Sequence, residues 1–395
     1  MKWSSSISTE TKLDKAVADA TDAIRKDMGD LPIHLTVVFV SPHFKAQYVL
    51  IPNLIRERLS PGILLGCSGG GIIGGGQEVE HKPAFSITCA HLPDVEVYKI
   101  QTDTLSLPED DTSPNVWREW IGVPVEKNPQ FIFLADPFSF RGEEFLAGID
   151  FAYPQSAKVG GLASGAQFQG ANALYLDDTI YNEGLVGVAL SGNIALDTIV
   201  AQGCRPIGEP HNITQCDQNL LLEIGGKPPL TVLEEMVETM SEYDRKLMQT
   251  SLFLGIEMDP FKDDPGQGDF LIRNLMGVDR NTGALSIGAM LREGQRVQFH
   301  LRDKVMSAED LSLLLSRYTE KGKPTGAQGA LLFSCLGRGE YLYGKPNHDS
   351  NVFKEKLGPV PLGGFFCNGE IGPVGNTTFL HGYTSSFGIF RPVRQ

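Results

Sequence analysis

The chain has 395 residues, of which 41% are hydrophobic and 21% charged, and this composition is typical of a globular protein large enough for two domains. Its formal net charge is −14 and its lysines and arginines are scattered, which disfavours nucleic acid and anionic membranes as main partners. No run of about 18 apolar residues occurs without a charge, so the sequence indicates no membrane insertion.

The cysteines and the amino terminus indicate the compartment. Six cysteines form no C-x-x-C pair, so neither a zinc ribbon nor a thioredoxin-type site is suggested. The first six residues are not followed by the apolar segment of a secretory signal. We therefore expect reduced thiols, no metal site and a cytoplasmic protein.

The first predicted elements are a helix and a strand. Apolar residues at helical spacing predict a helix over residues 9–28, and Gly29 is placed to end it. The apolar run at residues 35–40 predicts a buried strand. A second, shorter helix is predicted near residues 53–59.

A glycine-rich corner follows that helix and recurs later in the chain. Residues 59–76, 156–170 and 357–375 each have the form of a short apolar strand, a corner rich in glycine and the start of another strand. One constant shift along the sequence places Gly66 on Gly364. Each corner is preceded by an apolar strand and a possible helix, and followed by another apolar strand.

These units predict the fold class. We expect an α/β (mixed α+β) protein with two pseudo-symmetric halves of strand-helix-strand-Gly-corner-strand units, in stacked αββα layers. The segment 225–229, Gly-Gly-Lys-Pro-Pro, is the predicted boundary between domains, at 1–228 and 229–395. After it, Thr231 and Glu234 have the spacing of a capping box, which predicts a helix start.

Several segments resemble signatures of the FIST family, named for F-box and intracellular signal transduction. These are residues 203–208 (GCRPIG), 333–339 (FSCLGRG) and 361–372 (PLGGFFCNGEIG). The resemblance covers nearly the whole chain. It implies a FIST N-terminal domain at 1–228 and a FIST C-terminal domain at 229–395.

The resemblance also implies a sensory role. Bacterial relatives accompany signalling modules, and small ligands such as amino acids have been proposed for them. Some relatives bind haem and report nitric oxide, while a eukaryotic relative carries an F-box and selects substrates for ubiquitin ligation. We expect no kinase, methyl-accepting or F-box segment before the FIST-like region here, so the output would pass through a separate partner.

Seven residues are predicted to bind a small carboxylate ligand such as an amino acid. Arginine can clamp a carboxylate with two hydrogen bonds, whereas Asn368 and Glu370 could hold an amino group. The alternative is that each arginine pairs internally with Glu370, Asp279 or Asp303, and that the polar pair only braces its corner. The candidates are Ser68, Arg273, Arg302, Cys335, Arg338, Asn368 and Glu370.

Other functions remain open at this point. Gly66-x-Ser68-x-Gly70 has the form of a nucleophile elbow, but that motif needs a following helix and residues 71–76 are too rich in glycine. Cys335 near Arg338 could be a reactive thiolate, which would also suit an acyl-transfer enzyme.

Haem and protein binding give two further alternatives. His348 and His381 are the candidate ligands if the protein is a haem-based nitric-oxide sensor, although no cofactor is expected. The chain could also be a protein-interaction adaptor without a ligand.

Overall fold

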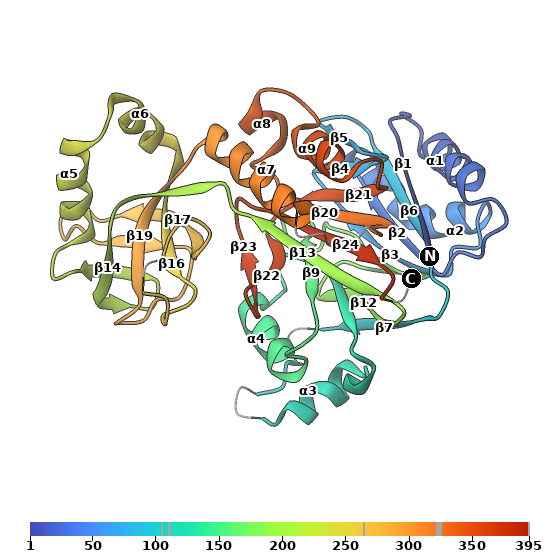
Figure 1. Ribbon diagram of the computed structural model, residues 1–395, viewed down its shortest axis with the longest axis horizontal. Helices are drawn as coiled ribbons and strands as arrows, with labels where there is room; N and C mark the ends of the chain where they lie inside the picture. Colours follow the sequence, from blue (N-terminus) through green and yellow to red (C-terminus); the bar gives the residue numbers. More distant parts are fainter. Residues whose placement is uncertain (104–105, 110–111, 264, 321–325, 394–395) are drawn as a thin grey trace. The chain divides into compact units, whose positions relative to one another are not determined.

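The computed structural model describes residues 1–103, 106–109, 112–263, 265–320 and 326–393. Two compact units are present: unit 1 comprises Met1–Val200 and Ser312–Gln395, and unit 2 comprises Ala201–Leu311. Helices accompany sheets of mixed strand direction, so the predicted mixed α/β class is confirmed (Figure 1). The predicted domain boundary at 228 lies inside unit 2, so the sequence domains and the compact units divide the chain differently.

The described part of unit 1 contains three mixed sheets. The first has the order β1 (Lys2–Ser8), β6 (Phe85–His91), β2 (Leu35–Val40), β3 (Ile63–Ser68), β10 (Leu174–Leu176) and β11 (Thr179–Tyr181). The second has the order β23 (Thr377–His381), β22 (Glu370–Val374), β9 (Lys158–Leu162), β8 (Gln130–Ala135), β12 (Leu185–Gly192) and β7 (Val95–Thr102). The third has the order β13 (Ala195–Ala201), β24 (Ser385–Arg391), β20 (Gly329–Cys335), β21 (Leu362–Cys367), β4 (Gly71–Gly74) and β5 (Gln77–Glu80).

A parallel strand pair in each sheet carries the repeated unit. The pairs are β2 with β3, β8 with β9, and β20 with β21. A Cβ atom at Gly66, Gly160 or Gly364 would lie 2.2, 1.9 or 1.9 Å from a carbonyl oxygen of the neighbouring strand. No side chain fits at that distance, so the three glycines are equivalent. The predicted correspondence of Gly66 with Gly364 is confirmed.

The hairpin that belongs to each repeat pairs with a strand of a different repeat. Hairpin β4–β5 of the first repeat pairs with β21 of the third, and β10–β11 of the second repeat pairs with β3 of the first. Hairpin β22–β23 of the third repeat pairs with β9 of the second. The exchange is cyclic, so each sheet is completed by another repeat.

The sheets of unit 1 share an apolar core and carry helices outside. In β2, Leu35, Val37 and Phe39 face the core between sheets, whereas Val38 and Val40 pack against helices. The helices are α1 (Leu13–Met28), the 3-10 helix η1 (Pro42–Leu50) and α2 (Ile51–Arg56) on the first sheet, α3 (Pro114–Ile121) and α4 (Gly142–Ala152) on the second, and α8 (Gly339–Tyr343) and α9 (His348–Leu357) in the third repeat.

Two helix predictions need correction. Helix α1 begins at Leu13 rather than at residue 9, because residues 2–8 form β1, which the helical pattern did not reveal. Helix α2 spans Ile51–Arg56, so it both begins and ends earlier than predicted, and it directly follows the 3-10 helix Pro42–Leu50.

Unit 2 is built around a closed six-stranded barrel of described residues. Its order is β14 (Cys204–Asp217), β15 (Leu220–Ile224), β18 (Leu285–Ile287), β17 (Phe270–Val278), β16 (Leu252–Glu257) and β19 (Arg296–Arg302). Helices α5 (Pro229–Thr239) and α6 (Glu242–Ser251) and the first residues of α7 (Lys304–Glu320) accompany it. Helix α5 starts at Pro229, not at the predicted Thr231 cap, because proline suits the first helical turn.

Candidate functional site

The predicted ligand-binding residues fall in different parts of the structure. Arg273 and Arg302 lie on barrel strands of unit 2 and are buried, with Arg273 Nη1 donating to the Ile272 carbonyl oxygen at 3.2 Å. The other five lie in unit 1. The structure therefore does not describe the seven as one site.

Arg338 is completely buried and is held by acidic and phenolic groups. Its Nε donates to Asp349 Oδ2 at 3.0 Å, and one terminal nitrogen donates to Asp349 Oδ1 at 3.3 Å and to the Tyr343 hydroxyl at 2.5 Å. The ion-pair partner is thus Asp349 rather than Glu370. Burial by itself would raise the Asp349 pKa, but Arg338 and hydrogen bonds from His348 and other neighbours outweigh burial and hold that pKa below its usual value.

Glu370 is also completely buried, at the start of β22. Its Oε2 accepts hydrogen bonds from the Thr384 backbone N–H at 3.2 Å and the Thr384 hydroxyl at 2.8 Å. Burial raises the pKa of Glu370 to about 8, although Thr384 and the charge of Arg338 act in the opposite direction. The carboxyl group is therefore largely protonated at neutral pH.

A further buried glutamate joins this region from another repeat. Glu78, on β5, accepts a hydrogen bond from the Ser350 backbone N–H at 2.6 Å. Burial first, and then the charge of Asp349, raise the Glu78 pKa to about 7. We call Glu78, Arg338, Asp349 and Glu370 the buried charge cluster.

Several polar atoms in and beside the buried charge cluster lack a hydrogen-bond partner. They are Glu78 Oε2, Arg338 Nη1, Ser350 Oγ and Glu370 Oε1. Such atoms are expensive to bury unless water or a ligand meets them. The cluster residues line none of three cavities of the described residues, which have volumes of about 310, 310 and 420 Å³.

Ser68 has the surroundings of a structural residue. Its buried hydroxyl accepts from the Ala173 N–H at 3.0 Å and donates to Asn172 Oδ1 at 3.2 Å. Asn172 in turn donates to Asp136 at 3.1 Å, and no histidine or carboxylate among the described residues is hydrogen-bonded to the Ser68 hydroxyl. Residues after the corner form strand β4, not the helix that a nucleophile elbow requires.

The remaining candidates do not converge on a described cavity. Cys335 is half-buried at the end of β20, and Asn368 is exposed with its backbone N–H on the Leu162 carbonyl oxygen at 3.0 Å. His348 stacks on Tyr343 with ring centroids 3.5 Å apart, while His381 Nε2 lies 3.0 Å from the Gly372 carbonyl oxygen. Both histidines are buried, and neither lines those cavities.

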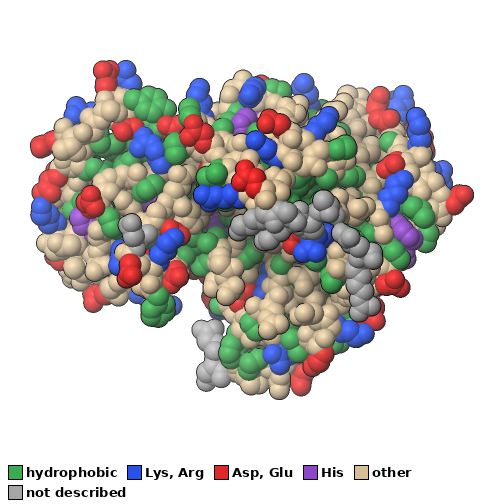
Figure 2. Space-filling model, viewed as in Figure 1, with side chains coloured by type: hydrophobic (Ala, Val, Ile, Leu, Met, Phe, Trp, Pro, Cys, Tyr) green, Lys and Arg blue, Asp and Glu red, His purple; other side chains and the backbone are tan. Residues whose placement is uncertain are grey.

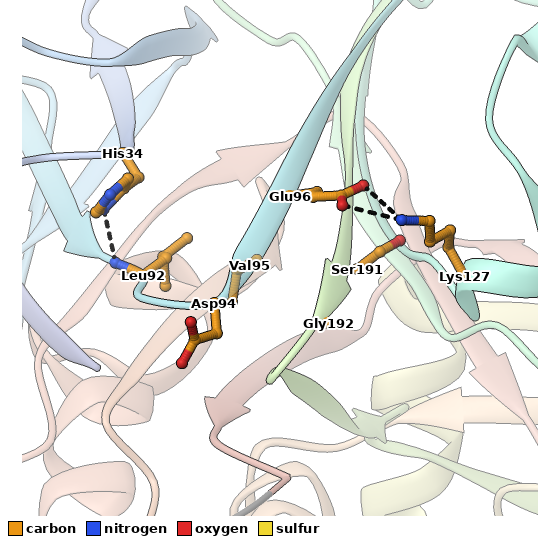
Figure 3. A pocket seen from close by; sticks show the side chains of 8 residues that line it. All are labelled: His34, Leu92, Asp94, Val95, Glu96, Lys127, Ser191 and Gly192. Atoms are coloured by element: carbon orange, nitrogen blue, oxygen red, sulfur yellow. Dashed lines mark hydrogen bonds and ion pairs between the residues drawn. The ribbon is translucent and has the colours of Figure 1, made fainter.

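A cavity of about 310 Å³ in unit 1 brings polar groups together from separate segments (Figure 3). We call it the Asp94 pocket. It lies where the start of the first repeat, the β6–β7 turn, the 3-10 helix η3 (Val125–Lys127) and the end of β12 meet. Its lining residues are His34, Leu92, Asp94, Val95, Glu96, Lys127, Ser191 and Gly192.

The backbone fixes Asp94 at the pocket. Asp94 has a left-handed φ of 60°, and its carbonyl oxygen accepts the Asn193 N–H at 2.9 Å. A Cβ at Gly192 would lie 2.3 Å from that carbonyl oxygen, so only glycine permits this approach. No ion pair or hydrogen bond of the Asp94 side chain is found with any described residue.

Three other groups complete the polar lining. His34 Nδ1 accepts the Leu92 N–H at 2.9 Å, which leaves Nε2 to carry the ring proton, and burial followed by the nearby His91 lowers the His34 pKa. The Ser191 hydroxyl is buried and has no hydrogen-bond partner. Lys127 pairs with Glu96 at 2.9 Å on the side of the pocket opposite His34 (Figure 3).

Sequence reasoning did not select these pocket residues. They come from four segments with no common motif, and each type is common on protein surfaces. The one local signal was the turn chemistry around Asp94 and Gly192.

The described residues show no membrane-spanning helix and no cluster of metal-ligating side chains. No helix among them is both long and apolar enough to cross a bilayer. No group of three or more His, Cys, Asp or Glu side chains is arranged to hold a metal ion. On the face shown in Figure 2, basic and acidic side chains are interspersed over the visible described residues.

Comparison with protein families identifies the chain. The FIST N domain model matches residues 34–227 and the FIST C domain model matches residues 229–373. An uncharacterized protein of Mycobacterium tuberculosis is 34% identical over 97% of this chain and 98% of its own. The chain therefore belongs to the FIST family, whose domains are associated with sensing in signal transduction.

More distant similarities are also present. An uncharacterized protein of Mycobacterium bovis is 33% identical over 95% of both chains. An F-box/LRR-repeat protein of Arabidopsis thaliana is 34% identical over 25% of this chain and 22% of its own. A solved cyanuric acid hydrolase from A. caulinodans aligns over all of both chains with 9% identity and a TM-score of 0.32, which supports no conclusion here.

Proposed function

We propose that this FIST protein is a sensory protein that binds an amino acid or another small carboxylate in the Asp94 pocket. The observation that carries the proposal is the convergence there of the Asp94 carboxylate and the buried Ser191 hydroxyl, neither of which has a hydrogen-bond partner among the residues that the structure describes. A volume of about 310 Å³ lies within the range of small-molecule sites.

The polar groups of the pocket suit a zwitterion. The Asp94 carboxylate would accept hydrogen bonds from an ammonium group. The His34 Nε2–H and the Ser191 hydroxyl would donate to a carboxylate, with the charge of Lys127 nearby. Because Glu96 already neutralises Lys127, the pocket alone has a charge of about −1 with neutral His34, which favours a ligand that brings an amine.

The ligand site proposed here is not the one predicted from the glycine corners. Arg338 and Glu370 are completely buried and do not line the Asp94 pocket, whereas the unpartnered Ser191 hydroxyl faces a cavity that a ligand could occupy. The proposal keeps the expected output through a separate protein. It also keeps a cytoplasmic location, where the six cysteines, which form no disulfide, would stay reduced.

A thermal unfolding screen with the twenty amino acids and small mono- and dicarboxylates tests the proposal. The three tryptophans, Trp3, Trp117 and Trp120, all lie in unit 1, so their fluorescence follows the unit that contains the pocket. A ligand at a hundredfold excess over its dissociation constant should stabilise the folded state by about 2.7 kcal/mol.

Two variants and one control locate the binding. Asp94→Asn removes the charge but keeps a residue that tolerates a left-handed φ, so it should fold and lose the shift. Ser191→Ala should weaken binding several-fold. Asp30→Asn, at an exposed aspartate that does not line the pocket, should behave as wild type. The proposal fails if no compound stabilises the wild type, or if Asp94→Asn retains the full shift.

A further inference from the structure

A second cavity, of about 420 Å³, lies in unit 2 between the barrel and helix α5. We call it the barrel pocket. Its lining is mainly apolar, with a few polar groups, which is the usual make-up of a small-molecule site at a barrel mouth. The lining residues are Ile207, Gly208, Glu209, His211, Ile224, Gly225, Lys227, Val232, Glu235, Met236, Thr239 and Phe299.

A β-bulge shapes one wall of the barrel pocket. Strand β14 pairs with β19 up to Ile207 and again from His211, so residues 208–210 leave the ladder. Gly208 has a φ of 62°, and a Cβ there would lie 2.8 Å from Met236 Sδ on α5. The Gln298 side chain donates to the Gly208 carbonyl oxygen at 2.6 Å and holds the bulge. Bulges of this kind redirect side chains, and this one places Glu209 on the pocket lining.

Not every charged side chain of the barrel pocket is paired with a partner of opposite charge. Lys227 Nζ contacts both carboxylate oxygens of Glu235, at 2.7 and 2.8 Å, so this pair is neutral. No ion pair or hydrogen bond joins the Glu209 side chain to any residue that the structure describes. The uncompensated charge beside the apolar lining is therefore negative.

The apolar part of the lining suits a flat or branched hydrocarbon group. Phe299 supplies an aromatic ring, and Met236 supplies a thioether, which packs well against aromatic rings. Ile207, Ile224 and Val232 add aliphatic surface.

We infer that the barrel pocket binds a small apolar amine, with its aromatic or branched group between Met236 and Phe299 and its protonated nitrogen at Glu209. This site is separate from the Asp94 pocket in residues, unit and ligand chemistry. The result of a binding test at the barrel pocket therefore does not bear on the proposed function.

Isothermal titration of the full chain with phenethylamine, and with 3-phenylpropionate as the probe of opposite charge, tests the inference. Phenethylamine should bind and 3-phenylpropionate should bind at least tenfold more weakly. Glu209→Gln should weaken phenethylamine binding about tenfold or more, because it removes the negative charge that no described residue neutralises. Glu234→Gln, on α5 but outside the lining, should leave binding unchanged.

A second variant tests the apolar contacts. Val232→Phe places a larger side chain in the cavity and should abolish binding of phenethylamine without altering the unfolding temperature of unit 1, followed by tryptophan fluorescence. The inference is overturned if phenethylamine does not bind, if 3-phenylpropionate binds equally well, or if Glu209→Gln binds as the wild type does.

Discussion

Two buried glutamates link the stability of unit 1 to pH. Burial raises the pKa of Glu78 to about 7 and that of Glu370 to about 8, from an ordinary value of 4.5. Between pH 5 and 8 the folded state therefore binds more protons than the unfolded state. The free energy of unfolding falls as the pH rises through this range.

Replacing one of these glutamates should flatten the pH dependence. Glu370→Gln keeps an oxygen that can accept from Thr384 but cannot ionise. The wild type should lose roughly 4 kcal/mol through Glu370 between pH 5 and 9, and the variant should not. Urea unfolding followed by tryptophan fluorescence measures this, with the exposed Glu355→Gln as control. An unchanged pH slope in Glu370→Gln would contradict the burial of an ionisable group there.

At the scale of elements, the repeated strand pairs depend on glycine for close approach. A Cβ at Gly364 would lie 1.9 Å from the Leu332 carbonyl oxygen, and neither backbone can move without breaking the pairing of β20 with β21. The glycine-rich corner is therefore a packing requirement of the sheets. Its sequence likeness to a nucleophile elbow has no catalytic basis in the described contacts.

A substitution at this position should be severely destabilising. Gly364→Ala should lower the free energy of unfolding of unit 1 by more than about 3 kcal/mol. Destabilisation this large arises from a few mechanisms, and overpacking is one of them. Gly326→Ala is the matched control, because an added Cβ there would meet no atom within 4 Å. Denaturant midpoints of the two variants provide the measurement. Equal midpoints would show that the close approach does not limit the strand pair.

The sequence predicted individual elements better than their partners. Strand β2 was predicted with its exact bounds because its apolar run is continuous. The correspondence of Gly66 with Gly364 could be predicted because no side chain fits at either position. The pairing of each hairpin with another repeat could not be predicted, since strands of three to five residues carry no information about their neighbour. The contact of Glu78 with Ser350 could not be predicted either, because the two residues lie far apart in the chain.

The site was harder to predict than the fold. His34, Asp94, Lys127 and Ser191 meet only because four segments end at one place, and none belongs to a recognisable motif. The conspicuous arginine of the third repeat was instead neutralised by Asp349, eleven positions further along the chain.

At the scale of the whole molecule, the cyclic exchange of hairpins makes the repeats of unit 1 interdependent. Each of the three sheets contains a hairpin from another repeat, and the buried charge cluster joins Glu78 of the first repeat to the third. No repeat can therefore unfold without breaking a neighbouring sheet.

Unit 1 should consequently unfold in one cooperative transition. Trp3 lies on β1 and stacks on Phe390, with ring centroids 4.5 Å apart, whereas Trp117 and Trp120 lie on α3 beside the second sheet. Trp3→Phe and the double variant Trp117→Phe/Trp120→Phe leave reporters in separate repeats. The urea transition of each variant is followed by tryptophan fluorescence and compared with the transition of the wild type, which is followed by far-ultraviolet circular dichroism. The slopes should be equal, and the midpoints should differ only by the destabilisation that the substitutions cause. Two transitions seen by one reporter would contradict the interlocked arrangement.

The proposed sensory role depends on ligand occupancy of the Asp94 pocket, and equilibrium dialysis against a mixture of the twenty amino acids measures this occupancy directly. After dialysis, the protein is denatured and the released compounds are quantified by mass spectrometry. Wild type and Asp30→Asn should retain the same amino acid at close to one equivalent, and Asp94→Asn should retain less than a tenth of it. Retention of none by the wild type, or equal retention by Asp94→Asn, would contradict the account.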